Sequence, residues 1–101
     1  MFFTVVAYDG TDAQAPERRL AVRAEHRALA AKMQEDGSLI CGAGILGENK
    51  EVIGSVMVYN FPSREAFEEH LQREPYVKGN VWEKIDIIDV NVKIARELPE
   101  D

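Results

Sequence analysis

Residues that cross-link or anchor a protein are scarce in this sequence. Cys41 is the only cysteine among 101 residues, so the chain can form neither an internal disulfide nor a cysteine-rich metal site. Such cysteine usage is typical of a reducing compartment. No apolar run approaches the roughly 20 residues that span a membrane, and no basic segment precedes residues 2–8. We therefore expect a cytoplasmic protein with no membrane partner.

Basic residues are outnumbered by acidic ones. The chain has 12 Lys and Arg against 18 Asp and Glu, a formal net charge of −6. Binding to the phosphates of nucleic acid requires clustered basic residues, so we expect no nucleic-acid partner. Hydrophobic residues make up 46% of the chain, enough to bury one compact core. Residues 1–101 are therefore expected to form a single domain.

Strand and helix patterns alternate along the chain. Alternating or β-branched apolar segments predict strands, whereas Pro16 as a helix start, Gly37 as a helix stop and Ser63 as a cap predict the helices. The expected strands are 2–8, 38–46, 51–61 and 84–94, and the expected helices run from Pro16 to Gly37 and over 64–74. This βαββαβ order predicts an α+β, ferredoxin-like fold, a four-stranded antiparallel sheet with both helices on one face.

The predicted sheet has apolar side chains on both faces. In the strand 51–61, Met57 and Tyr59 share one face while Val56 and Val58 share the other, because side chains alternate along a strand. Two helices cover only one face, and the other would be an exposed apolar patch. We therefore expect a homodimer packed sheet to sheet. The alternative is that the C-terminal segment folds back over the open face.

His26 lies on the inward stripe of the first helix. Val22, His26, Leu29 and Met33 recur at helical spacing, so they face the sheet. An imidazole there is either a core residue whose ring nitrogens bond to neighbours or a general base or acid, because histidine exchanges protons near neutral pH. The deciding feature is a carboxylate within reach of the ring.

Two carboxylates are candidates for this contact. The topology gathers Asp9 and Glu74 at the end of the sheet where the first helix starts. Ser55 lies at a depth similar to that of His26. Arg19 lies two turns before His26, where it either binds an anionic substrate group or is an ordinary surface arginine. We expect Arg23 and Arg27 to lie to the side of this stripe and to be solvated.

Three stretches carry a recognisable pattern: "RRLAVRAEHRALAAKMQEDGSLICGAGIL", "GSVMVYNF" and "REPYVKGNVWEK". Together they resemble the YciI-like (YCII-related) family of the dimeric α+β barrel superfamily. The most specific parts are the pattern R-L-x-V-R-x-x-H ending at His26 and the pair Gly54-Ser55. The resemblance implies a small enzyme with a histidine and aspartate pair. The histidine is His26, and Glu74 stands where the aspartate is usual, before Pro75 and Tyr76. Asp9 matches another acidic position typical of the family.

The other reactive side chains have simpler interpretations. Tyr76 and Trp82 either line the pocket mouth or close the core. Cys41 is expected to be a small buried hydrophobe, and His70 to face solvent. Two histidines on separate helices and no acidic cluster at ligand spacing predict no metal site. The glycines of 42–47 do not lead from a strand into a helix, so we expect no nucleotide or other cofactor.

These features lead to three hypotheses of function. The first is a cofactor-independent enzyme on a small cyclic or aromatic, possibly anionic, substrate. In it His26 moves a proton, Glu74 or Asp9 orients the ring, and Ser55, Arg19 and Tyr76 bind the substrate. The resemblance favours isomerisation or a dehydrohalogenase-like elimination over hydrolysis. The second hypothesis is a small-molecule binding or accessory module without turnover, and the third is a dimeric scaffold whose His26 is only a core residue.

Overall fold

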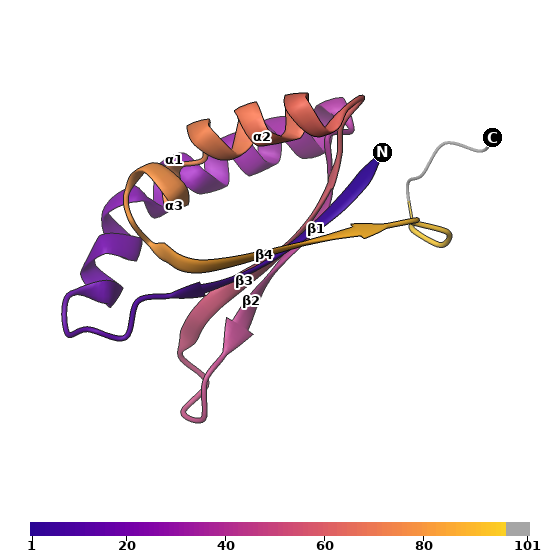
Figure 1. Ribbon diagram of the computed structural model, residues 1–101. Coiled ribbons are helices and arrows are strands. Elements are labelled where there is room, and N and C mark those ends of the chain that lie inside the picture. Colours follow the sequence, from indigo (N-terminus) through magenta and orange to yellow (C-terminus); the bar gives the residue numbers. More distant parts are fainter. Residues whose placement is uncertain (97–101) are drawn as a thin grey trace.

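The computed structural model describes residues 1–96, which form a sheet with helices on one side (Figure 1). The elements are β1 (Phe2–Asp9), α1 (Ala15–Asp36), β2 (Leu39–Leu46), β3 (Val52–Asn60), α2 (Arg64–Arg73), α3 (Pro75–Lys78) and β4 (Trp82–Val90). The strand order is β2-β3-β1-β4, and every neighbouring pair is antiparallel. The predicted ferredoxin-like fold is confirmed. No helix within residues 1–96 is both long and apolar enough to cross a membrane.

The core lies between the sheet and the helices. Phe3, Val5 and Ala7 of β1 are at most 1% exposed, because their side chains all point to the helix side. The ring of Phe3 stacks on that of Phe67 of α2, with centroids 4.4 Å apart. This packing fixes α2 over β1.

Local signals set the ends of the two long helices. Gly37 ends α1 with φ of 89°, a left-handed conformation that glycine adopts without steric cost. The Ser63 hydroxyl caps α2 by accepting a hydrogen bond of 3.1 Å from the backbone N–H of Ala66. Pro16 lies in the first turn of α1, as expected.

The chain after α2 differs from the prediction in two ways. A four-residue helix, α3, was not predicted from the sequence. In addition, β4 covers Trp82–Val90 rather than residues 84–94. Trp82 pairs with Asp9 and Val90 pairs with Phe2, so β1 supplies no further partners beyond those two residues. The length of β1 therefore determines where β4 ends.

The face of the sheet opposite the helices is open in the single chain (Figure 1). Its side chains include an aromatic ring and aliphatic groups from three strands: Val6, Tyr8, Val56, Val58, Ile88 and Val90. Tyr8 is 40% exposed and Ile88 is 50% exposed. The sequence also allowed the C-terminal segment to cover this face, but Ile94 of that segment is 95% exposed and does not pack on it. The last residues of that segment, 97–101, lie outside the described residues.

Candidate active site

A cavity of about 650 Å³ lies between α1 and the sheet and is lined by His26, Ser55, Met57 and Tyr76. His26 points inward, as its helical spacing predicts, and the residue is 8% exposed. Ser55 lines the same cavity from β3, which agrees with its expected depth. Residues from α1, β2, β3 and α3 therefore meet around one hollow.

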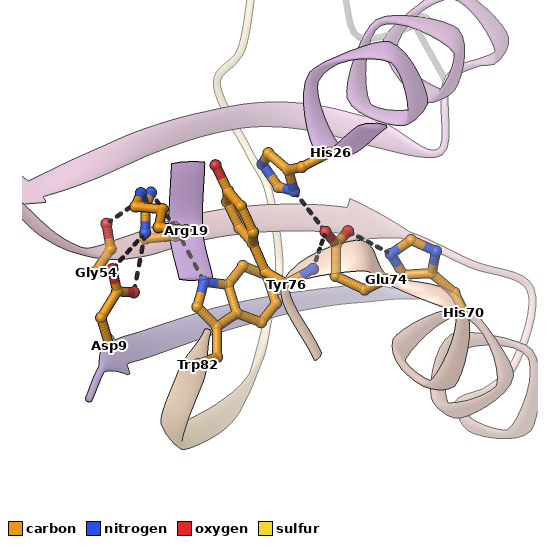
Figure 2. A network of polar contacts seen from close by, with 9 residues as sticks. Asp9, Arg19, His26, Gly54, His70, Glu74, Tyr76 and Trp82 are labelled. Atoms are coloured by element: carbon orange, nitrogen blue, oxygen red, sulfur yellow. Dashed lines mark hydrogen bonds and ion pairs between the residues drawn. The ribbon is translucent and has the colours of Figure 1, made fainter. Parts of the chain in front are cut away.

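The ring of His26 is paired with Glu74. The distance from His26 Nδ1 to Glu74 Oε1 is 2.5 Å, and Glu74 is only 2% exposed (Figure 2). A carboxylate accepts hydrogen bonds, so Nδ1 carries the proton and donates it. In the neutral form of the ring, the other nitrogen, Nε2, then carries the lone pair, on the side away from Glu74. An imidazole held in this way can accept a proton at Nε2.

The short helix α3 fixes both neighbours of the His26 ring. Glu74 precedes α3 as its N-cap, and its Oε1 also accepts a hydrogen bond of 3.2 Å from the backbone N–H of Tyr76. The Tyr76 ring stacks on His26 with centroids 3.9 Å apart and an interplanar angle of 15°. Tyr76 lies between His26 and Arg19, whose guanidinium carbon is 4.6 Å from the tyrosine centroid (Figure 2).

Asp9 binds Arg19 and not His26. Arg19 Nη1 donates to both carboxylate oxygens of Asp9 at 2.9 Å, and Arg19 Nη2 donates to Ser55 Oγ at 3.1 Å. Trp82 Nε1 donates to the same Ser55 oxygen at 3.2 Å. Of the two carboxylates that the sequence left as alternatives, Glu74 reaches the imidazole. Asp9 neutralises Arg19 instead, and Trp82, 5% exposed, closes the core.

The expectation that His70 faces solvent is wrong. His70 is 8% exposed, and its Nε2 lies 3.8 Å from Glu74 Oε2 (Figure 2). Its ring packs 4.7 Å from the ring of Tyr59. Burial lowers the pKa of His70, while the nearby Glu74 carboxylate acts in the opposite direction. The signal was available, because His70 follows Phe67 by three residues and therefore shares its inward stripe on α2.

Tyr59 lies on the other side of this buried cluster. Burial, with a smaller effect from Glu74, raises the pKa of the Tyr59 hydroxyl. Within residues 1–96, neither the Tyr59 hydroxyl nor His70 Nε2 has a hydrogen-bond partner. Glu74 is therefore flanked by two imidazoles, with His26 hydrogen-bonded and His70 only nearby.

Cys41 is exposed and lines the cavity, so the expectation of a buried thiol is also wrong. The reason is that β2 is an edge strand, with a neighbour on one side only. Arg23 and Arg27 are exposed as expected, yet both line the cavity, which the sequence reading missed. The sequence could have indicated this, because Arg19, Arg23 and Arg27 follow one another at a spacing of four residues, and residues at that spacing share a helix face. In the described part of the chain, no three acidic, histidine or cysteine side chains gather to hold a metal ion.

Comparisons with known proteins agree with the fold and the resemblance. No curated protein matches the chain in sequence. The solved structure of 5-chloro-2-hydroxyhydroquinone dehydrochlorinase (TftG) from Burkholderia phenoliruptrix, in complex with 2,5-dihydroxybenzoquinone, is similar with a TM-score of 0.77. The two are 17% identical, and the match covers 90% of this chain and 94% of that one, a likeness that concerns the fold. The family model of the YCII-related domain matches residues 1–91, so the chain belongs to the YCII-related domain family.

Proposed function

We propose that this protein is a cofactor-independent enzyme that transfers a proton on a small cyclic or aromatic substrate, as an isomerase or a dehydrohalogenase-like lyase. The observation that carries the proposal is the 2.5 Å contact of His26 Nδ1 with the buried Glu74 carboxylate, on a ring that lines a cavity. Glu74 also caps α3, so the proposal rests on the combination of the buried counter-charge with a ring that lines a cavity, which a core histidine does not require. The dehydrochlorinase activity in the name of the structural neighbour supports the same reaction class.

The Glu74 carboxylate gives His26 its proposed role as a base. Because the Nδ1–H is hydrogen-bonded to Glu74, Nε2 is the ring nitrogen that takes a proton from a substrate carbon. The charge that then develops on the imidazole is offset by the carboxylate, in the manner of a hydrolase triad. In an elimination, the electron pair of the broken C–H bond forms a carbon–carbon double bond, and a halide leaves the adjacent carbon with its bonding pair. In an isomerisation, His26 returns the proton to a different carbon.

Ser55 and Tyr76 are assigned to substrate binding, and Arg19, predicted from the sequence to bind substrate, is assigned to positioning these two residues. The Ser55 oxygen already accepts hydrogen bonds from Arg19 and Trp82, so its own O–H remains to donate into the cavity. Tyr76, which is 2% exposed, lines the cavity, and burial raises the pKa of its hydroxyl, which favours the protonated form that can donate a hydrogen bond. Arg19 lies against the Tyr76 ring and holds it in place. In this assignment Asp9 acts indirectly, as the counter-ion that orients Arg19.

The test compares turnover and binding in the same variants. Candidate substrates are 5-chloro-2-hydroxyhydroquinone and a panel of unsaturated lactones, assayed for chloride release and for uptake of solvent deuterium at carbon. His26→Gln and Glu74→Gln are expected to lower the rate at least about 100-fold, with substrate affinity nearly unchanged. Glu68→Gln is the matched control, because Glu68 lies on the exposed face of α2. Full turnover in His26→Gln would exclude the mechanism, whereas binding without turnover in the unmodified protein would favour the binding module.

We further propose that two copies pair through the open face of the sheet. The support is the exposed apolar surface formed by side chains such as Tyr8 and Ile88, which in a monomer would remain in contact with water. A shared interface of this kind is self-complementary, as in most two-fold dimers. Sedimentation at micromolar concentration is expected to show a dimer, and Val58→Asp is expected to dissociate it. A monomer in the unmodified protein would refute this arrangement.

A further inference from the structure

Three arginines of α1 face the candidate active site together. Arg19, Arg23 and Arg27 follow one another at a spacing of four residues and all line the cavity that His26 lines. Arg19 is neutralised by Asp9 and its donors are engaged by Ser55. Arg23 and Arg27 differ, because neither forms an ion pair within residues 1–96. Among the described residues, the cavity is therefore bordered by two guanidinium groups without an ion-pair partner, although Arg23 also lines a neighbouring pocket that contains Glu51.

This concentration of positive charge is notable in an acidic chain. The protein carries a formal net charge of −6, and like charges four residues apart destabilise a helix slightly. No acidic side chain is among the described residues that line this cavity, and the two carboxylates of the proposed site are compensated or covered. Asp9 is bound by Arg19, and Glu74 is 2% exposed behind the His26 ring. An anion entering the cavity would therefore meet positive charge on α1 without facing an open carboxylate.

We infer that the cavity binds small organic anions, with Arg23 and Arg27 holding the negative group while the remainder of the molecule lies against His26 and Tyr76. The inference deepens the proposed function by naming a substrate class, and its binding step does not depend on proton transfer. Arginine suits this role because its planar fork of N–H donors matches the oxygens of a carboxylate or a phosphate. The cavity volume of about 650 Å³ fits a small molecule and not a polymer.

The field near the Tyr76 hydroxyl agrees with this assignment. Burial raises the pKa of Tyr76, and Arg19 and Arg23 act against that rise, so both guanidinium groups influence the tyrosine oxygen. Arg23 precedes His26 by three residues and Arg27 follows it by one. An anionic group at these arginines would place an attached ring near the imidazole, where proton transfer is proposed.

The experiment uses three probes of similar shape and different charge: benzoate, phenyl phosphate and benzamide. Binding to the intact protein is followed by calorimetry and by the fluorescence of Trp82, the only tryptophan. At least one of the two anions is expected to bind about tenfold more tightly than benzamide, and which one binds better distinguishes carboxylate from phosphate recognition. Arg23→Gln and Arg27→Gln are each expected to weaken anion binding about tenfold and to leave benzamide unaffected.

Two controls make the outcome decisive. Arg73→Gln removes an exposed arginine of α2 that does not line the cavity, and it is expected to change nothing. His26→Gln is expected to keep the preference for anions over benzamide, so a failure of proton transfer leaves this inference standing. The inference is overturned if benzamide binds as tightly as both anions, if none of the three probes binds, or if Arg23→Gln and Arg27→Gln bind the anions normally.

Discussion

Asp9 and Asp12 offer a matched comparison of two aspartate–arginine pairs. Asp9 lies 2.9 Å from Arg19 with side chains 7% and 15% exposed, respectively. Asp12 lies 2.7 Å from Arg18 with side chains 48% and 33% exposed. The exposed pair has the shorter contacts and the two-nitrogen fork geometry, whereas the Asp9 pair uses one guanidinium nitrogen, so only burial favours a larger cost at Asp9. We predict that Asp9→Asn destabilises the protein much more than Asp12→Asn.

The expected magnitude follows from the charge that each substitution leaves behind. Without the Asp9 carboxylate, Arg19 is a sheltered cation whose remaining partners are the Ser55 hydroxyl, the Gly54 carbonyl and the Tyr76 ring, none of which carries a negative charge. Removing one partner of a buried pair costs about 3–5 kcal/mol. Because Arg19 is partly exposed, we expect Asp9→Asn to cost about 3 kcal/mol. The melting temperature then falls by more than about 10 °C. Arg18 left by Asp12→Asn is solvated, so that substitution changes the free energy of unfolding little.

Urea unfolding at fixed protein concentration, followed by Trp82 fluorescence, measures both effects. The measurement is repeated in 50 mM and 500 mM NaCl, since salt screens the exposed pair and leaves the sheltered one largely intact. The loss from Asp9→Asn is therefore expected to persist at high salt. Equal destabilisation by the two substitutions, or a loss from Asp9→Asn that disappears in high salt, would refute the reasoning from burial.

Three further substitutions test other parts of the fold. Gly54→Ala is expected to lower the free energy of unfolding by about 1–3 kcal/mol in urea titrations. The reason is that the added Cβ would collide with the Ala7 carbonyl of the neighbouring strand. A neutral effect would contradict that contact. Ser63→Ala removes the cap bond to Ala66 and is expected to cost about 1 kcal/mol in the same assay, whereas an unchanged midpoint would mean that the cap is dispensable. Burial lowers the pKa of His70 from 6.5, so the unfolded chain binds that proton first and stability falls as the pH drops below 6.5. His70→Leu is expected to reduce this slope between pH 7.5 and 5, and an identical slope would show that His70 is not its source.

The fold was largely predictable because its signals are local. Pro16, Gly37 and Ser63 mark helix ends through their own backbone and side-chain chemistry, and alternation identifies the strands without knowledge of their partners. The end of β4 depends on pairing with β1, which no local pattern reveals. The helix α3 is too short to show a helical period. These two features are the parts that the sequence did not predict.

The site was predictable in part for the same reason. Helical spacing places His26 inward, and the same rule applied to α2 would have placed His70 inward beside Phe67. The choice between Asp9 and Glu74 was different. Both carboxylates lie at one end of the sheet, and only the path of the chain after α2 decides which of them reaches the imidazole. Spacing along one element cannot contain that information.

The sequence resemblance implies an aspartate at position 74, and the backbone at this position shows how the glutamate of this chain is placed. Glu74 has an extended conformation, with φ of −62° and ψ of 124°, and caps α3. Its Oε1 accepts hydrogen bonds from both the Tyr76 N–H and the His26 ring, so one carboxylate oxygen joins the first turn of α3 to the imidazole. The pairing of Glu74 with His26 therefore depends on α3, which makes Pro75–Lys78 part of the site and not merely a connection between α2 and β4.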